Sequence, residues 1–384
     1  MKRKSLIAVI LFCVFMVACG KVGSEDNEKN LKEKDLSRSN NISVESEVQN
    51  STENLKKLDG VGNEFEVPKD LKSIGITPIP WASVVFAVDG GSDRISTINP
   101  SAMSAYKSSF LEKIDPNYGK IDTSIIGSDF KFNSEELVNR GIQAMVIWDD
   151  QDMEAENLKT LGITPVMVQN KTKEALQESL RAIGQLLNKE DRANRFVKLY
   201  DDGYKIMESY GEKLEKVDKK KVLFLKNPEL KIMGVDNFIN EAGKMAGANL
   251  IGGKSKSITM EEIMKEDPDI ILLSNFDDFT PHDFYKNTLP GQDWSQIKAV
   301  KNKQVYKVPI GIYRWDAPGV ETPLMMQWMG KVIQPDVFSD LDFKGHFHDF
   351  YKEYFHYQLT KEDVEQILNE KANSDSLKIE LERK

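Results

Sequence analysis

Four aromatic side chains stand on stretches of the sequence that we expect to be loops: Trp81, Trp148, Tyr313 and Trp315. Core packing alone does not explain large rings on loops, and broad flat rings suit a large organic ligand such as a planar metal chelate. Because tryptophan is often partly buried, we expect about half of these rings to pack against neighbouring loops. The others predict a ligand-binding surface.

Arg314 lies between two of these rings and is the strongest single candidate for contacting a ligand. Its guanidinium offers a rigid fork of donors that fits a carboxylate, a catecholate, a hydroxamate or an oxyanion. The alternative role is an ion pair with Asp316 or Glu321, which follow it closely in the sequence. The sequence leaves both roles open.

The histidines give weak support for a bare metal site. His346, His348 and His356 lie near the end of the sequence, where such side chains in a polar segment are most often solvated. His282 is the one histidine on a loop that follows an expected strand, and it is an alternative axial ligand for haem. Tyr313 is the other side chain able to reach iron directly. We therefore expect no resident metal ion and no cofactor.

Catalysis and nucleic-acid binding are both disfavoured. The two cysteines, Cys13 and Cys19, lie near the start of the chain, which leaves the body without a thiol nucleophile, a disulfide or a thiolate zinc site. Neither a Gly-x-Ser-x-Gly elbow nor a His-Glu-x-x-His pattern occurs, which argues against a cell-surface hydrolase. A net charge of −9 provides no basic surplus to replace the counterions of nucleic-acid phosphates. We predict a protein that is not an enzyme.

The segments that position these loops alternate between strand and helix. Short apolar runs predict strands at 73–77, 95–98, 144–147, 165–168, 222–225, 270–273 and 304–308, with helical patterns at 82–88, 152–161 and 238–245. This alternation indicates an α/β fold with mostly parallel sheets. Ligands of such sheets bind beyond the carboxyl ends of the strands. That rule adds Tyr106, Asn275 and Phe276 to the candidate ligand-binding residues.

One unit of the sequence occurs twice. Residues 135–138 (Glu-Glu-Leu-Val) precede one strand and residues 261–264 (Glu-Glu-Ile-Met) precede another, with nine positions from the first glutamate to the strand in both copies. The repeat predicts two related lobes, with chance similarity of two α/β units as the alternative. A helical pattern over 172–217, with a kink at 188–191, predicts the connection between the lobes.

The first sixty residues predict export and attachment to a membrane. Residues 1–18 form a signal peptide, because three basic residues precede an apolar run that is too short to span a membrane. The small residues before Cys19 resemble a bacterial lipobox, which implies cleavage there and lipidation of the thiol. An ordinary signal with an incidental cysteine is the alternative. Residues 19–60 contain no aromatic residue and predict a lipidated, disordered tether.

Several short motifs follow one another in a characteristic order. They are Gly-Gly-Ser-Asp-Arg-Ile at 90–95, Asn-Ser-Glu-Glu-Leu at 133–137, Leu-Gly-Ile-Thr-Pro-Val at 161–166, Glu-Ala-Gly at 241–243, Met-Glu-Glu-Ile at 260–263, Asp-Pro-Asp at 267–269 and Trp-Ser-Gln-Ile-Lys-Ala-Val-Lys-Asn at 294–302. This order resembles the substrate-binding lipoproteins of ABC importers for siderophores, haem, cobalamin and related metal complexes. The resemblance covers about residues 71–368. Residues 351–368 are similar to a branch that handles iron complexes or molybdate.

The resemblance implies a domain organisation and a partner. It predicts an N-terminal lobe at 61–170, a connecting helix at 171–217, a C-terminal lobe at 218–335 and a C-terminal helical tail at 336–384, with the ligand in a cleft between the lobes. Glu135 and Glu261 match the family's two acidic residues that dock into arginine pockets of the permease. Stabilisation of their own helix dipoles is the alternative role for these glutamates.

The resemblance also implies a function. We expect a monomeric lipoprotein, anchored on the extracytoplasmic face of the cell membrane, that captures a ferric siderophore or similar metal complex. It would deliver this ligand to the permease and ATPase subunits of an importer. Haem, a corrinoid and a molybdate-type oxyanion are alternative ligands. A structural or adhesive lipoprotein would not need an aromatic-lined cleft between two lobes.

Overall fold

A computed structural model describes residues 57–233, 238–253 and 256–383. The predicted signal peptide, lipidation at Cys19 and most of the predicted tether lie outside these residues. The tether prediction is wrong at its end, because residues 57–60 belong to the folded body. Strand β1 (Lys57–Leu58) pairs with β2 (Glu64–Phe65), and the amide of Gly60 donates to the carbonyl of Met167 at 2.8 Å.

The N-terminal lobe is built around a four-stranded parallel sheet. Its strands, in the order β4-β3-β5-β6, are β4 (Ile95–Ile98), β3 (Ile74–Ile76), β5 (Ala144–Trp148) and β6 (Thr164–Val168). Its helices are α1 (Ile79–Asp89), α2 (Pro100–Lys107), α3 (Leu111–Ile114), the 3₁₀ helix η1 (Pro116–Lys120), α4 (Ser134–Asn139) and α5 (Asp152–Thr160). Helices cover the sheet, so most residues of its strands are buried.

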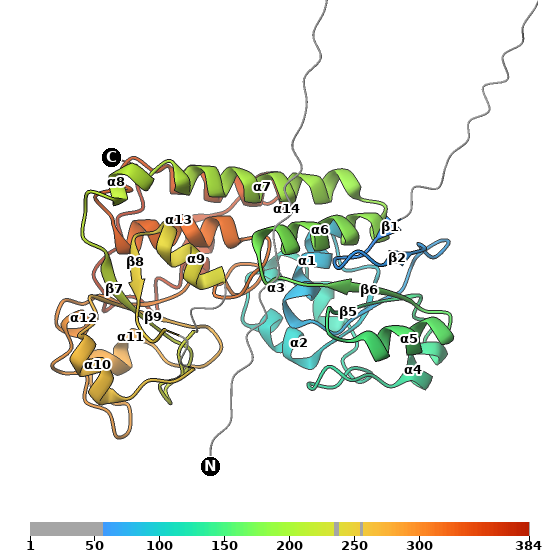
Figure 1. Ribbon diagram of the computed structural model, residues 1–384, viewed down its shortest axis with the longest axis horizontal. Helices are drawn as coiled ribbons and strands as arrows, with labels where there is room; N and C mark the ends of the chain where they lie inside the picture. The colour runs from blue at the N-terminus through green and yellow to red at the C-terminus, as the bar shows by residue number, and fades with distance from the viewer. Residues whose placement is uncertain (1–56, 234–237, 254–255, 384) are drawn as a thin grey trace, which may run out of the picture. The chain divides into compact units, whose positions relative to one another are not determined.

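The C-terminal lobe repeats this plan. Its parallel sheet has the order β10-β9-β7-β8, with β10 (Val305–Lys307), β9 (Ile270–Leu273), β7 (Lys220–Leu225) and β8 (Ala248–Leu250). Its helices are α9 (Phe238–Met245), α10 (Met260–Glu266), α11 (Pro281–Tyr285) and α12 (Lys298–Lys301). The predicted fold class of two similar α/β lobes is confirmed, and Figure 1 shows the two sheets toward opposite ends of the long helix α7 (Glu190–Glu208).

The helical connection predicted for 171–217 is divided into α6 (Lys173–Leu187), α7 (Glu190–Glu208) and α8 (Gly211–Leu214). Asn188, with φ of 52°, adopts the left-handed conformation that ends α6. Where a kink within one helix was expected, the chain therefore reverses direction between two helices. Helix α6 then lies antiparallel to α7, because Gln177 near its start donates to the carbonyl of Val197 at 3.2 Å. Of these three helices, only α7 therefore extends from one lobe to the other.

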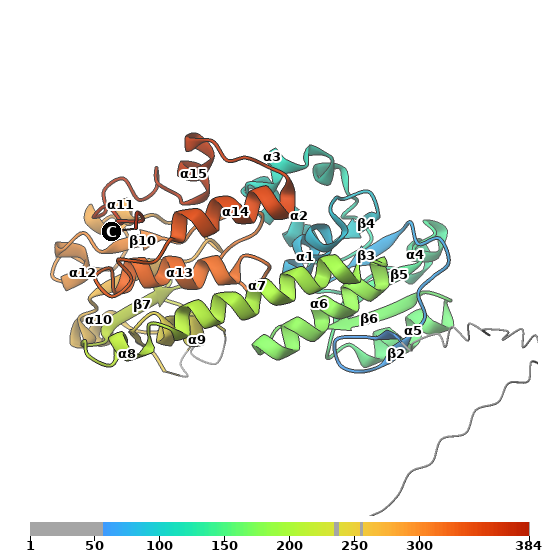
Figure 2. The same ribbon diagram turned by 90° about the horizontal axis from the view of Figure 1, so that it is seen from above.

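Contacts along α7 join the two lobes (Figure 2). Near its start, Nε of Arg192 donates to the carbonyl of Ala87 in α1 at 2.7 Å. Near its end, the hydroxyl of Tyr204 donates to Oε2 of Glu241 in α9 at 3.1 Å. Helix α13 (Thr322–Ile333), which is buried along its whole length, packs against α7. One hydrophobic cluster includes side chains of both lobes and of these helices.

The last part of the chain packs on this body. It contains α14 (Phe343–Phe355) and α15 (Lys361–Ile367), while residues 368–383, where further helix was expected, form turns and irregular backbone. The side chain of Asn373 accepts from the amide of Lys307 at 2.7 Å and donates to its carbonyl at 3.0 Å. The turns thus satisfy the outer edge of β10, which no strand covers. No helix of the described chain combines the length and apolarity of a membrane span.

The crossing of α7 and α13 depends on Gly203. A Cβ atom at this position would lie 2.6 Å from Cβ of Pro323, so α13 would have to move. We expect Gly203→Ala to lower the free energy of unfolding by about 1–3 kcal/mol, as overpacking does. Gly211→Ala is the matched control, since nothing lies within 4 Å of the added atom. Urea denaturation of both variants tests this, and equal effects would contradict it.

Candidate functional site

Three side chains gather beyond the carboxyl ends of neighbouring strands in the C-terminal lobe. Lys226 follows β7, Phe276 follows β9 and Arg314 follows β10. Cζ of Arg314 lies 4.7 Å from the ring centroid of Phe276, and Nζ of Lys226 lies 5.2 Å from the same centroid. The face of an aromatic ring attracts cations, so Phe276 holds two positive charges close together. We call these three residues the cation cluster.

Arg314 does not form the ion pair with Asp316 or Glu321 that the sequence left open. Its Nε is buried without a hydrogen-bond partner, and no ion pair of this side chain occurs within the described ranges. A buried guanidinium donor without a partner is costly unless a ligand or water pairs with it. Arg314 therefore has a buried donor that no described protein group satisfies, beside the exposed ring of Phe276.

Asp316 binds the loop that carries Phe276. It is fully buried, and its Oδ2 accepts hydrogen bonds from the hydroxyl of Ser274 and, at 3.0 Å, from the amide of Asn275. Burial raises the pKa of Asp316. The side chain of Asn275 donates to the carbonyl of Val308 at 2.8 Å. Asn275, a predicted ligand contact, thus ties the loop after β9 to the end of β10.

Glu321 holds the loop that carries Arg314. Its buried carboxylate accepts from the amide of Tyr313 at 3.2 Å and from the hydroxyl of Tyr351 in α14 at 2.6 Å. Gly311 is required here, because a Cβ atom would overlap with Oε1 of Glu321. The carbonyl of Gly311 in turn accepts from the amide of Phe110 in the N-terminal lobe at 2.8 Å. The loop between β10 and α13, which carries Arg314 and which we call the arginine loop, is therefore fixed to both lobes.

Two tryptophans expected to face the ligand lie in the core. Trp81 and Trp315 are each only 1% exposed. Trp81 stands in α1, where every residue from 81 to 88 is buried, so this helix has no free face. Trp315 packs edge-on against Phe343 and Phe347 of α14. The structure contradicts a ligand-facing position for both rings.

The two predicted tyrosines are buried as well. Tyr106 stacks on Tyr118 at 4.8 Å, and its hydroxyl donates to the carbonyl of Asp115 at 3.1 Å. The ring of Tyr313 is 6% exposed, and burial raises its pKa. Tyr106 is therefore a packing residue, while Tyr313 serves through its backbone amide.

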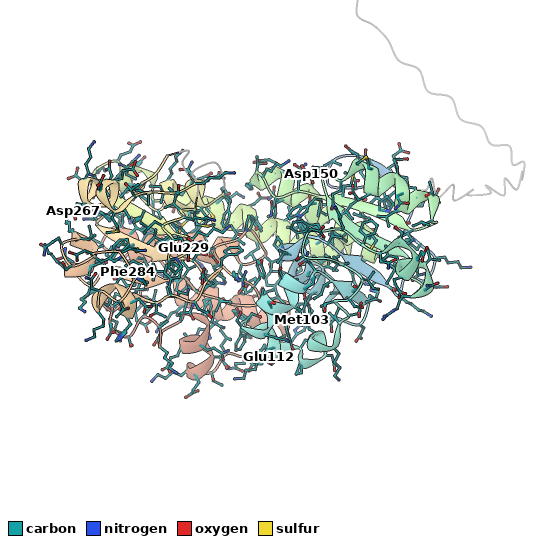
Figure 3. The ribbon with its side chains drawn as sticks, turned by 90° about the horizontal axis from the view of Figure 1, so that it is seen from below. Met103, Glu112, Asp150, Glu229, Asp267 and Phe284 are labelled. Atoms are coloured by element: carbon teal, nitrogen blue, oxygen red, sulfur yellow. The ribbon has the colours of Figure 1, made fainter. Side chains whose placement is uncertain are left out.

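The N-terminal lobe retains one aromatic ring at a strand end. Trp148 closes β5 and is half-buried, with its amide donating to Oε1 of Gln151 at 2.9 Å. Asp150, two positions after Trp148, is exposed. Glu229, in the loop after β7 of the other lobe, is exposed as well, and Figure 3 labels both residues. Trp148 and Phe276 are the predicted aromatic residues that stay accessible.

The histidine alternatives find no support. Nδ1 of His282 lies 2.7 Å from Oδ2 of Asp375, in a surface hydrogen bond with the C-terminal turns. Nδ1 of His346 lies 2.7 Å from Oε1 of Gln327. The described residues contain no group of three or more His, Cys, Asp or Glu side chains able to hold a metal ion.

Glu135 and Glu261 occupy equivalent positions in the two lobes. Each is exposed in the first turn of its helix, α4 or α10. The neighbouring glutamates serve the helices instead: Glu136 pairs with Arg140 at 3.6 Å, and Glu262 accepts from the amide of Thr259 at 2.8 Å. Neither Glu135 nor Glu261 makes a side-chain ion pair within the described chain, so both carboxylates face solvent uncompensated.

Lys226 is the site residue that the sequence analysis missed. The strand before it was recognised, and the rule that nominates residues beyond strand ends applies to it equally. Its contact with Phe276 brings together residues 50 positions apart, and strand order alone makes them neighbours.

Comparison with known proteins shows which family the chain belongs to. Residues 145–310 match the family model described as periplasmic binding protein. A crystal structure of a periplasmic solute binding protein from Veillonella parvula is 38% identical, with a TM-score of 0.79, and the match covers 83% of this chain and 98% of that one. The Helicobacter pylori CeuE structure with Ni(II) bound is 25% identical over 82% of this chain and 99% of its own, with a TM-score of 0.64.

A curated relative, the molybdate-binding protein MolA of Haemophilus influenzae, is 23% identical over 190 residues. That match spans 47% of this chain and about half, 52%, of MolA. The two-lobed fold and the 38% identity to the Veillonella parvula protein identify the chain as a solute-binding protein. The chain belongs to the periplasmic binding protein family.

Glu321 predicts how stability depends on pH. Burial raises the pKa of its carboxyl to about 7. Between its ordinary pKa and about 7 the folded state binds more protons than the unfolded state, so the free energy of unfolding falls as pH rises through this window. We expect Glu321→Gln to remove this contribution, with the amide keeping the contacts to Tyr313 and Tyr351. Denaturation at several pH values measures it, and identical profiles for both proteins would contradict it.

Proposed function

We propose that this solute-binding protein captures an anionic, metal-containing ligand and delivers it to an ABC importer. The observation that carries the proposal is the cation cluster: two positive side chains share the exposed ring of Phe276 beyond three adjacent strands. The ligand would lie between the cluster and the N-terminal lobe, with Trp148 on the opposite side.

A molybdate-type oxyanion is the ligand that this site favours. Its compact negative charge matches the guanidinium of Arg314 and the ammonium of Lys226. The burial of Trp81, Trp315 and Tyr313 removes most of the ring surface that a large planar chelate would need. The match to a molybdate-binding protein supports the same choice.

A ferric siderophore is the second candidate. Phe276, 38% exposed, and the half-buried Trp148 remain as ring surfaces for an organic chelate. Visible absorbance of the purified protein separates the two candidates: a broad charge-transfer band indicates a ferric chelate, and a Soret band would indicate haem instead. A colourless protein that binds molybdate supports the oxyanion.

Arg314 provides the test of the site. We expect Arg314→Ala to weaken binding by about 1.5–3 kcal/mol, because a hydrogen bond to a charged group is lost. Arg314→Lys keeps the charge without the planar fork and should lose less. Titration calorimetry with molybdate and with a ferric siderophore panel measures both variants. Arg195→Ala, on the exposed side of α7, is the control. Unchanged affinity of Arg314→Ala for every ligand that binds the wild type would move the site elsewhere.

Docking to the importer is proposed to use one face of each lobe. Glu135 and Glu261 are uncompensated, and each is followed three residues later by an exposed apolar side chain, Val138 at 49% and Met264 at 50%. Positions three apart share a helix face, so each lobe offers an acid beside an apolar residue. Each of two similar permease subunits would bind one of these two similar sites. Lipidation at Cys19 would hold the protein at the same membrane.

Charge reversal tests this docking. We expect Glu135→Arg or Glu261→Arg to abolish ligand uptake by cells and to leave ligand affinity unchanged, because neither side chain belongs to the cation cluster. Glu112→Arg, an exposed glutamate of α3, is the control for a change of net charge. A loss of affinity equal to the loss of uptake would count against docking.

A further inference from the structure

Lys307 is a buried lysine that no ligand role explains. It is the last residue of β10 and only 8% exposed. Its Nζ donates to the carbonyls of Ser274 at 2.7 Å, Asp277 at 2.7 Å and Phe279 at 2.9 Å. Nζ also lies 4.7 Å from the ring centroid of Phe279. An ammonium has three donors, and here all three are used.

These carbonyls all belong to one loop, residues 274–279, which follows β9. Lys307 forms no ion pair with a carboxylate within the described structure, so backbone carbonyls accept all of its hydrogen bonds. Lysine is rarely buried in this way. The ammonium thus occupies the centre of the loop as a bound cation would, and the chain turns its carbonyls inward around it. The carboxylates of Asp277 and Asp278 are left at the surface.

The loop held by Lys307 carries the centre of the cation cluster. In the sequence, Phe276 lies between Ser274 and Asp277, whose carbonyls accept from Lys307. Its ring contacts both Arg314 and Lys226. If the loop relaxed, the ring would move and the two cations would lose their common position. Asn275, beside it, would also release the carbonyl of Val308.

We propose that Lys307 is a positioning residue for ligand binding, which fixes loop 274–279 and thereby the cation cluster without touching the ligand. The effect on affinity rests on the proposed function. The effect on the loop does not, because it is present in the protein without ligand.

Lys331 in α13 provides a matched control. It is 2% exposed, and its Nζ donates to the carbonyls of Ser339 at 3.3 Å and Glu382 at 3.0 Å. Replacing either lysine by methionine removes a buried ammonium of the same length. Both variants should lose stability, but only Lys307→Met releases the loop under the cation cluster.

The experiment measures two quantities on the full chain: affinity for molybdate and for a ferric siderophore panel, and hydrogen exchange of amides 275–279 without ligand. We expect Lys307→Met to weaken binding by roughly tenfold or more, as loss of a supporting contact does, and to speed exchange in the loop. Lys307→Gln, which keeps two donors, should lie between wild type and Lys307→Met. Lys331→Met should change neither quantity. Loop exchange and affinity equal to wild type in Lys307→Met would overturn the proposal.

A measurement on the wild type covers the case in which the variants fail to fold. Burial lowers the pKa of Lys307 to about 8; the nearby carboxylates of Asp316, Asp278 and Asp277 act in the opposite direction, and Arg314 adds to the lowering. Above this pH the amine keeps only two donors. Exchange of amides 275–279, corrected for its intrinsic pH dependence, should therefore rise between pH 7 and 9.5 relative to amides 339–341. A constant ratio would contradict the proposal. If wild type binds none of the probes, the proposed ligand class fails while the exchange result still decides the role of Lys307.

Discussion

The buried carboxyl group of Glu321 is the contact on which the arrangement of the lobes and the site depends. It accepts from the backbone of the arginine loop and from Tyr351 of α14, at the point where that loop also meets Phe110 of the N-terminal lobe. Burying a carboxyl is unfavourable unless its oxygens are hydrogen-bonded, and both are. The same group therefore determines where Arg314 stands and how closely the second lobe approaches the first.

Much of the fold could be predicted from local pattern. Strands such as β5 and β9 are short apolar runs bounded by turn residues, and α10 begins with a capping box, so neighbouring residues specify them. The burial of Trp315 could not be predicted in this way, because its partners Phe343 and Phe347 lie about 30 positions later. Trp81 is different. Its helix is apolar all round, which indicates a buried helix, so the sequence contained the signal.

The location of the site could be predicted from the sequence better than the contacts within it. Strand ends nominated Phe276 and Arg314, and the structure brings them into contact. The alternation of β10 would put Lys307 on one face of the sheet as an ordinary polar residue, and only the path of the following loop explains its burial. Interactions that depend on backbone carbonyls leave no trace in residue types, which is why this side chain was not recognised.

The turns after α15 have a consequence for association between molecules. Strand β10 lies at the end of its sheet, and its outer amide and carbonyl groups pair with Asn373 and Ser376, not with another strand. An uncovered edge of this kind recruits strands from other chains and leads to aggregation. Asn373 and Ser376 thus prevent edge-to-edge association of β10 between molecules at high local protein concentration.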